Sequence, residues 1–286
     1  MVRVVPPPRP YIVLFGDSLT QMGFGEFTTA STTASNATSS SSSEIFSPGW
    51  VSLLSTVYQR RADVLNRGYS GYNTRHAIDI ILPNVLGDDN AEVGGNDDPQ
   101  PNPPLFCTVF LGANDSALPG ERQHVPKEEY AKNIAKIVTK IKQRYYSNYV
   151  SENNNQATGG TKVSIILFSP PPVDQVKWRR ELGLYEHFDR SNDVARQYGL
   201  AVQEVANELG CPFLDAWALL GGNQNVETYS QHLSDGLHLS TSGNRLLFDG
   251  LMDLIRTELP HLLPSKTDDS LEQGIQINDA LWSDLC

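Results

Sequence analysis

The stretch Tyr11–Thr20, YIVLFGDSLT, constrains the fold of this chain more than any other. Its run of apolar residues, Ile12–Phe15, is typical of a short, fully buried strand. Gly16 permits a sharp exit from that strand, and Asp17 and Ser18 follow at once. Open α/β sheets bind their ligands at the carboxyl ends of the strands, so Ser18 is a candidate nucleophile. Gly, Asp and Ser are also common turn residues, and this stretch alone leaves an ordinary turn as the alternative.

Segments with strand and helix spacing alternate along the rest of the chain. Further strands are expected at Asp63–Asn66, Leu105–Leu111, Val163–Phe168 and Pro212–Leu214. Apolar residues three and four positions apart predict helices from near Pro48 through Val57, from Asn73 through Leu82, from Pro126 through Ile141, over Asp193–Leu209, and from Ser240 or Thr241 through Ile255. Gly199 weakens the expectation that the fourth helix is continuous, because glycine costs about 1 kcal/mol against alanine inside a helix. The alternation predicts an α/β fold, with a parallel sheet, helices on both faces and right-handed crossovers.

The composition does not change in a way that would divide the chain into two globular parts. Residues 11–264 are therefore expected to form a single domain, preceded by a proline-rich lead-in at residues 1–10. Polar segments near 28–43, 87–104 and 151–160 lack apolar periodicity, so we predict loop insertions there, a flexible one over 28–43. Residues 265–286 carry scattered apolar side chains, including Trp282, and are expected to dock as a C-terminal tail.

Charge and composition exclude several kinds of partner. The formal net charge of −11 argues against nucleic acid and against anionic membranes, which would repel this chain. No apolar run approaches the ~18 residues of a membrane-spanning helix, and the N-terminus lacks the pattern of a signal peptide. The chain has only three, scattered cysteines, Cys107, Cys211 and Cys286, which fit neither a disulfide framework nor a zinc site. A cytoplasmic protein without metal or cofactor is the expectation.

His238 is the candidate general base for Ser18. Asp235 stands three residues before it, so its carboxylate can turn back to the ring Nδ1 and leave Nε2 facing the serine. Gly236 suits the tight turn between them. Taken in isolation, this segment also fits a plain loop that leads into the last helix. Of the other histidines only His232 competes, and it lacks an acidic residue at short range upstream.

Four separated blocks resemble the GDSL or SGNH family of serine esterases and lipases. They contain Ser18 in GDSL, Gly68 at the end of NRG, Asn114 in GAND and His238 in DGLH. The resemblance implies an oxyanion hole built from the backbone N–H groups of Ser18 and Gly68 and the side-chain amide of Asn114. It also implies a three-layer α/β/α, flavodoxin-like fold whose five-stranded parallel sheet has the order 2-1-3-4-5.

Two further segments, Ser169–Asp174 (SPPPVD) and Ser234–Asn244 (SDGLHLSTSGN), are most similar to the isoamyl acetate-hydrolysing branch of that family. This similarity implies a carboxylic ester hydrolase for short, acetate-type acyl groups and small to medium apolar alcohols, acting through an acyl-enzyme on Ser18. A lipase- or thioesterase-type enzyme for longer acyl chains and a binding protein without catalysis are the alternatives. The tail around Trp282 would bury apolar area by closing over the cleft or by meeting a second subunit in a homodimer.

Other classes of enzyme and binding module fit less well. A metal-dependent phosphoesterase would need several ligand histidines, typically with an Asp two residues before one of them, and no histidine here has that neighbour. A nucleotide-binding module would need a glycine-rich phosphate loop after the first strand, which is missing. We therefore interpret Asp17 and Asp115 as hydrogen-bonding supports of their loops and not as catalytic acids.

Overall fold

The computed structural model describes residues 9–30, 43–86, 103–146, 163–183 and 187–264. Most of the proline-rich lead-in, most of the first two predicted insertions, all of the third, and the C-terminal tail with Trp282 lie outside these residues. The predictions made for those segments are therefore not addressed by the structure.

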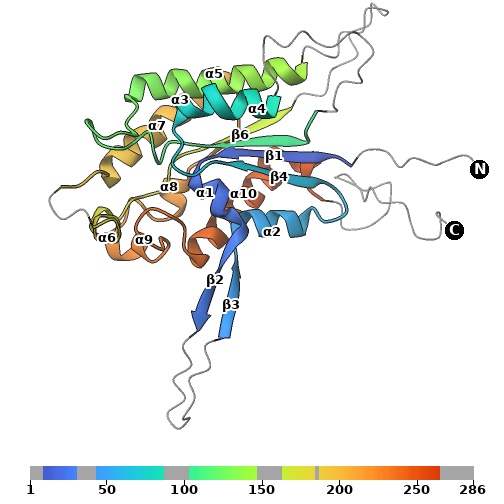
Figure 1. Cartoon of the computed structure of the whole chain (residues 1–286). Coiled ribbons are helices and arrows are strands. Elements are labelled where there is room, and N and C mark those ends of the chain that lie inside the picture. Colours follow the sequence, from blue (N-terminus) through green and yellow to red (C-terminus); the bar gives the residue numbers. More distant parts are fainter. Residues whose placement is uncertain (1–8, 31–42, 87–102, 147–162, 184–186, 265–286) are drawn as a thin grey trace, which may run out of the picture.

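A five-stranded parallel sheet forms the centre of the molecule (Figure 1). Its strands are β1 (Tyr11–Gly16), β4 (Asp63–Gly68), β5 (Phe106–Phe110), β6 (Ser164–Phe168) and β7 (Phe213–Leu214). They lie in the order β4-β1-β5-β6-β7, which is the expected order 2-1-3-4-5 once the two strands outside this sheet are set aside. The α/β fold and its sheet are thus confirmed. In the register, Gly16 at the end of β1 pairs with Gly68 on one side and Phe110 on the other, so three strands end together at one edge.

Helices cover both faces of this sheet (Figure 1). On one face lie α3 (Thr74–His76), the π-helical turn η2 (Ala77–Ile81), α4 (Leu82–Leu86), α5 (Lys127–Tyr146) and α7 (Asn192–Leu209). The other face carries α2 (Trp50–Val57), α8 (Ala216–Leu219), α9 (Val226–Ser230), α10 (Thr241–Glu258) and the short turn η4 (Pro260–Leu262). Two further helices, α1 (Ser18–Gln21) and α6 (Gln175–Glu181), lie in the loops that follow β1 and β6. None of the helices in the described ranges is long and apolar enough to span a membrane.

The central strand β1 shows why the apolar run predicts burial on both sides. Ile12 and Leu14 belong to the core beneath α2 and α10, whereas Val13 and Phe15 belong to the core beneath α5 and α7. All four side chains are at most 2% exposed. Successive residues of a strand point to opposite faces, so both faces of this strand must be apolar.

The helix boundaries follow the capping residues. Asn73 caps α3 by accepting the N–H of His76, and Ser240 caps α10 by accepting that of Gly243. Of the two candidate caps for the last helix, Ser240 is thus the one used. The helix α7 is continuous through Gly199, where an added Cβ would come within 3.2 Å of the Ser169 side chain. This glycine permits close packing of α7 on the end of β6 without breaking the helix.

The prediction of a loop over the whole of residues 28–43 is wrong at both ends of that segment. Strands β2 (Gly25–Ala30) and β3 (Ser43–Pro48) pair antiparallel and project as a ribbon from the body (Figure 1). The rings of Phe27 and Phe46 face each other across the ribbon with centroids 5.2 Å apart. Cross-strand aromatic pairs stabilise antiparallel strands, and this pairing is not visible in a search for helical or core periodicity. Pro48 consequently ends β3, and the following helix begins at Trp50.

Candidate active site

The candidate nucleophile Ser18 opens the short helix α1 at the carboxyl end of β1. Asp17 caps this helix, because its Oδ1 accepts the N–H of Leu19 at 3.0 Å and its carbonyl accepts the N–H groups of Thr20 and Gln21. A Cβ on Gly16 would lie 2.0 Å from Thr20 Oγ1, so only glycine allows this sharp exit from the strand. The turn holds Ser18, which is 4% exposed, in a fixed place at the edge of the sheet.

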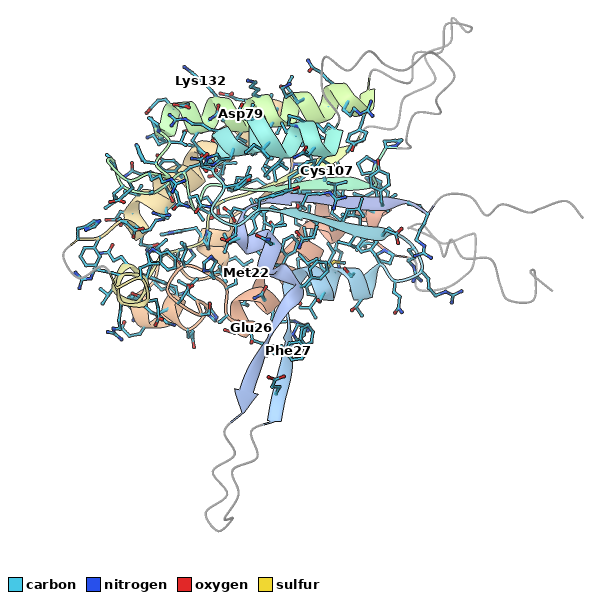
Figure 2. All side chains as sticks on the ribbon, in the orientation of Figure 1. Met22, Glu26, Phe27, Asp79, Cys107 and Lys132 are labelled. Atoms are coloured by element: carbon cyan, nitrogen blue, oxygen red, sulfur yellow. The ribbon has the colours of Figure 1, made fainter. Side chains whose placement is uncertain are left out.

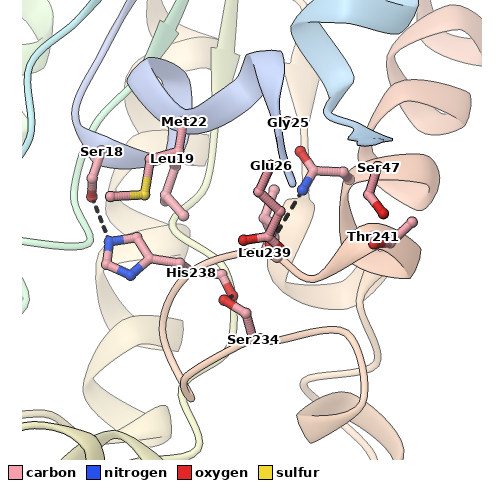
Figure 3. A pocket seen from close by; sticks show the side chains of 11 residues that line it. Ser18, Leu19, Met22, Gly25, Glu26, Ser47, Ser234, His238, Leu239 and Thr241 are labelled. Carbon is pink, nitrogen blue, oxygen red and sulfur yellow. Dashed lines mark hydrogen bonds between the residues drawn. The ribbon is translucent and has the colours of Figure 1, made fainter. Parts of the chain in front are cut away.

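Ser18, His238 and Asp235 form a continuous hydrogen-bonded row, whose Ser18–His238 bond is drawn in Figure 3. His238 Nε2 lies 2.9 Å from Ser18 Oγ, and Nδ1 lies 2.6 Å from Asp235 Oδ2. The carboxylate favours a proton on Nδ1, which leaves Nε2 as an acceptor for the serine proton. The structure therefore brings together the three residues that the sequence suggested as nucleophile, base and acid.

Asp235 is held as an anion by its surroundings. Burial acts to raise the pKa of this carboxyl, but hydrogen bonds from the ring and backbone N–H of His238 and from the N–H of Leu237 outweigh burial and lower the pKa to about 2. The two backbone bonds measure 2.8 and 2.9 Å. Asp235 is therefore ionised at neutral pH, and an anion at this distance from Nδ1 is suited to stabilise a protonated imidazole ring.

The turn that carries the acid and the base is packed against α6. Gly236 has a φ of +100°, a conformation that glycine adopts readily. A Cβ there would lie 2.5 Å from the backbone nitrogen of Trp178 and 2.6 Å from the carbonyl oxygen of Asp174. The Trp178 ring meets the His238 ring edge-on, with centroids 5.7 Å apart. This edge-on contact restricts the orientation of the imidazole.

Asn114 follows β5 and lies at the same edge of the sheet. Asn114 is 3% exposed, and both ends of its amide form hydrogen bonds. Nδ2 donates to the carbonyl of Tyr72 at 2.8 Å, and Oδ1 accepts from Gln123 Nε2 at 2.9 Å. Nδ2 carries a second N–H, for which no acceptor is found in the described part of the chain. This N–H is available to a bound anion.

Gly68 departs from the role implied by the family resemblance. Its backbone N–H donates to Asn66 Oδ1 at 2.9 Å, so this donor is already engaged. A Cβ on Gly68 would lie 2.2 Å from the backbone nitrogen of Gln21, which shows that this glycine lets β4 pass close beneath the nucleophile turn. Three residues later, Gly71 has no acceptor for its N–H among the described residues, and its carbonyl accepts from Gln123 Nε2 beside Asn114.

Asp17 and Asp115 support their loops, as the sequence suggested. Asp115 accepts the N–H of Thr74 at 3.0 Å and the Thr74 hydroxyl at 2.5 Å, and so ties the loop after β5 to α3. Both carboxyls are 0% exposed. Burial raises the pKa of Asp17 to about 7 and that of Asp115 to about 6.

The remaining candidates lie away from this row. His232 Nδ1 is 2.9 Å from Ser242 Oγ at the start of α10, so the alternative base is occupied elsewhere. Within the ranges that the structure describes, no group of three His, Cys, Asp or Glu side chains could hold a metal ion.

A pocket of about 280 Å³ opens beside Ser18 and His238 (Figure 3). It lies between the base of the β2–β3 ribbon and the beginning of α10. Its wall near the serine is apolar and includes Leu19, Met22 and Leu239. Its other side carries Glu26 from the ribbon, whose position beside Met22 and Phe27 is visible in Figure 2. The pocket thus offers the nucleophile a small, mixed apolar and polar space.

Comparison with known proteins gives the same assignment. Residues 14–246 match the model of the GDSL-like Lipase/Acylhydrolase family. The isoamyl acetate-hydrolyzing esterase 1 homolog of Homo sapiens is 36% identical over 261 residues, which cover 89% of this chain and 86% of that protein. A GDSL esterase/lipase of Arabidopsis thaliana is 33% identical over 258 residues, covering 87% and 86%.

Solved structures share the fold. An acetylxylan esterase from Geobacillus stearothermophilus superimposes with a TM-score of 0.55 at 20% identity, covering 87% of this chain and 95% of that one. A lipase/acylhydrolase from Enterococcus faecalis gives a TM-score of 0.55 at 21% identity, covering 86% and 95%. With the match to the family model and the identity to the esterases, this chain belongs to the GDSL-like lipase/acylhydrolase family and is a carboxylic ester hydrolase.

Proposed function

We propose that this hydrolase cleaves short-chain, acetate-type esters of small to medium apolar alcohols through an acyl-enzyme on Ser18. The observation that carries the proposal is the unbroken row Ser18–His238–Asp235 at the wall of a pocket of about 280 Å³. That volume lies just below the range of ~300–1,000 Å³ for small-molecule sites. A space of this size beside the nucleophile favours a short acyl group.

The reaction follows from the positions of the protons. Ser18 Oγ attacks the ester carbonyl while its proton passes to His238 Nε2, and Asp235 stabilises the resulting imidazolium. The tetrahedral intermediate then collapses, and Nε2 returns the proton to the departing alcohol. Nε2 then accepts a proton from a water molecule, whose oxygen attacks the acyl carbonyl. The second tetrahedral intermediate collapses, Nε2 returns the proton to Ser18 Oγ, and the acid is released.

The oxyanion of each intermediate requires donors that are fixed before the reaction. In our proposal these are the backbone N–H of Ser18 and the second N–H of Asn114 Nδ2, neither of which has an acceptor in the described residues. Gly71 supplies the third donor in place of Gly68. The support is that the Gly68 N–H donates to Asn66, whereas the Gly71 N–H has no acceptor among the described residues. Gly71 is also linked to Asn114, because Gln123 Nε2 donates to both.

The preference for acetate rests on two lines of support. The apolar wall formed by Leu19, Met22 and Leu239 suits an alkyl group, and the small pocket limits its length. The human relative at 36% identity is named for the hydrolysis of isoamyl acetate. The competing function is a lipase- or thioesterase-type activity on longer acyl chains.

A first assay tests the chemistry. Hydrolysis of a chromogenic acetate should proceed with EDTA present and be lost after treatment with a sulfonyl fluoride reagent. The Ser18→Ala variant is the matched control and should be inactive with and without the reagent. Activity that survives the reagent would overturn Ser18 as the nucleophile.

A second assay tests the size of the substrate. Values of kcat/KM for C2, C4, C8 and C12 acyl esters of one alcohol should be highest at C2. A maximum at C8 or beyond would contradict the short-acyl proposal and favour the lipase-type function.

A further inference from the structure

The direction in which the Asn114 amide points decides what it offers an oxyanion. An asparagine side chain presents a donor at one end and an acceptor at the other. With Nδ2 toward the substrate it stabilises the developing negative charge, and with the amide flipped Oδ1 would repel that charge. A catalytic asparagine therefore needs something that fixes its direction.

A series of hydrogen bonds leads from Arg190 through Gln123 to the Asn114 amide. Arg190 Nη2 donates to Gln123 Oε1 at 2.6 Å. Gln123 Nε2 donates to Asn114 Oδ1 at 2.9 Å and to the carbonyl of Gly71 at 3.0 Å. Asn114 Nδ2 in turn donates to the carbonyl of Tyr72 at 2.8 Å. The bonds form one chain, from a guanidinium through two amides to a backbone carbonyl.

The donors and acceptors in this series of hydrogen bonds cannot be exchanged. A guanidinium only donates, so the end of Gln123 that faces Arg190 must be the oxygen. A backbone carbonyl only accepts, so the end that faces Gly71 must be the nitrogen. That nitrogen requires Oδ1 on the facing end of Asn114, which leaves Nδ2 for Tyr72 and for the substrate. Both amides are thus oriented by groups that cannot exchange their roles.

Arg190, at the start of this series of hydrogen bonds, is held by several contacts. Arg190 is 2% exposed, and Nη1 lies 3.0 Å from Asp189 Oδ2 in a buried ion pair. Its Nε donates to the carbonyl of Ala113, the residue before Asn114, at 3.1 Å. Arg190 therefore contacts the backbone next to Asn114 directly and the Asn114 side chain through Gln123.

We propose that Gln123, oriented by Arg190, is a positioning residue that holds the Asn114 amide with its donor toward the oxyanion. This inference rests on the proposed role of Asn114 in ester hydrolysis. Gln123 does not touch the reacting atoms, and its effect on the reaction passes through Asn114.

Substitutions at Gln123 give a sharper test than substitutions at Arg190. Removing Arg190 would leave the carboxylate of Asp189 buried without its partner, which is strongly destabilising. Gln123 borders a second pocket, of about 480 Å³, which leaves room for an altered side chain. Gln123→Met keeps the length of the side chain and removes its hydrogen bonds, whereas Gln123→Glu keeps the acceptor for Arg190 and replaces the donor to Asn114 by an acceptor.

The expected result is a loss in kcat with little change in KM. We expect Gln123→Met to lower kcat about tenfold or more, below the limit of roughly 10²–10³-fold for loss of a whole oxyanion donor. Gln123→Glu should lower kcat further than Gln123→Met, because its carboxylate favours the flipped amide. Gln231→Met removes a comparable amide-to-carbonyl bond, to Thr228 at 2.9 Å, and should keep the kcat of the unaltered protein. Unchanged kcat in Gln123→Glu would overturn the inference.

A double-mutant cycle separates positioning from a general structural effect. In the Asn114→Ala background, Gln123→Met should have no further effect on kcat, because the group that it orients is gone. A full additional loss there would mean that Gln123 acts on the site by another route, and would also overturn the inference. If Asn114→Ala itself leaves kcat unchanged, the proposed role of Asn114 fails; if only the Gln123 variants do so, the positioning role alone fails. Thermal unfolding of each variant identifies losses that reflect misfolding.

Discussion

At the scale of single residues, the proposed nucleophile Ser18 and the proposed base His238 are expected to act as one unit. His238 Nε2 lies 2.9 Å from Ser18 Oγ, so the loss of either side chain removes the same proton-transfer step. We expect Ser18→Ala and His238→Ala each to abolish nearly all turnover of a chromogenic acetate. The double variant should be about as inactive as either single one, because losses within such a unit are not additive. A double variant far slower than both single variants would contradict the assignment of these residues as one unit.

The sequence was sufficient for the residues whose partners are set by local spacing. Asp235 reaches His238 because the two stand three positions apart around a glycine, and Ser18 was marked by the strand before it. Gln123 and Arg190 were missed, because they are 67 positions apart and carry no motif. Gly68 was assigned to the oxyanion hole on its block alone. The structure shows the Gly68 N–H bonded to Asn66, whereas the Gly71 N–H has no acceptor among the residues that are described.

At the scale of elements, the position of the base depends on the packing of its turn against α6. We expect Gly236→Ala to lower both thermal stability and kcat, the latter at least tenfold, since a misplacement of about 1 Å can cost ~10²-fold in rate. The added methyl would clash with the backbone of Asp174 and Trp178, which cannot yield as a flexible side chain would. Unfolding midpoints and steady-state rates on an acetate ester measure both effects. Gly183→Ala tests positive φ alone, because it has a φ of +68° and open space around its Cβ; it should keep its kcat. Full activity of Gly236→Ala would show that the turn tolerates a shift.

Among the described residues, the ribbon β2–β3 supplies the one acidic side chain on the wall of the pocket, Glu26. Glu26 is exposed and faces the space that the substrate would occupy (Figure 3). Its negative charge should disfavour esters that carry a carboxylate on the alcohol or acyl part. We expect Glu26→Gln to raise kcat/KM several-fold for such an anionic ester and to leave it unchanged for a neutral ester of the same size. Glu44→Gln, on the other strand of the ribbon and outside the lining of the pocket, is the matched control. An equal change for both esters would mean that Glu26 does not act by its charge.

Helices and strands of the main domain were largely predictable, because their apolar periodicity reflects burial. The five strands and the strand order agree with expectation. The ribbon was not predictable from that signal, since its aromatic side chains pair across the strands at the surface: Phe27 is 70% and Phe46 47% exposed. The short helices α6, α8 and α9 were missed for a related reason, because each is too short to show a helical period.

At the scale of the whole molecule, the site lies where two separate cores meet. One core lies beneath α2 and α10 and the other beneath α5 and α7, on opposite faces of the same sheet. Asp17 and Asp115 are buried in the loops that follow β1 and β5. Asp17 Oδ2 has no hydrogen-bond partner among the described residues. Burial of these two carboxyls should make the stability of the fold depend on pH.

The sign of this dependence follows from the direction of the pKa shifts. Burial raises the pKa of Asp17 from 3.8 to about 7 and that of Asp115 from 3.8 to about 6. Between pH 3.8 and each raised pKa, the folded state therefore binds more protons than the unfolded state. Their contribution to stability is fully present below pH 3.8 and is lost as the pH rises through 6 and 7. The pKa of Asp235 is lowered to about 2, so its contribution is lost instead as the pH falls from 3.8 toward 2.

Replacement of Asp17 by asparagine tests this account. The amide keeps an oxygen for the N–H of Leu19 and cannot ionise, so Asp17→Asn should remove that part of the fall in Tm that occurs as the pH rises toward 7. The fall between about pH 4 and 6, to which both carboxyls contribute, should become smaller but remain, because Asp115 is still present. Asp79→Asn, at an exposed position on η2, is the control and should keep the full slope of the unaltered protein. Thermal unfolding in steps from pH 4 to 8 gives all three profiles. Parallel profiles for Asp17→Asn and the unaltered protein would mean that the folded and unfolded states bind the same number of protons at Asp17. The pKa of Asp17 would then not be raised by folding.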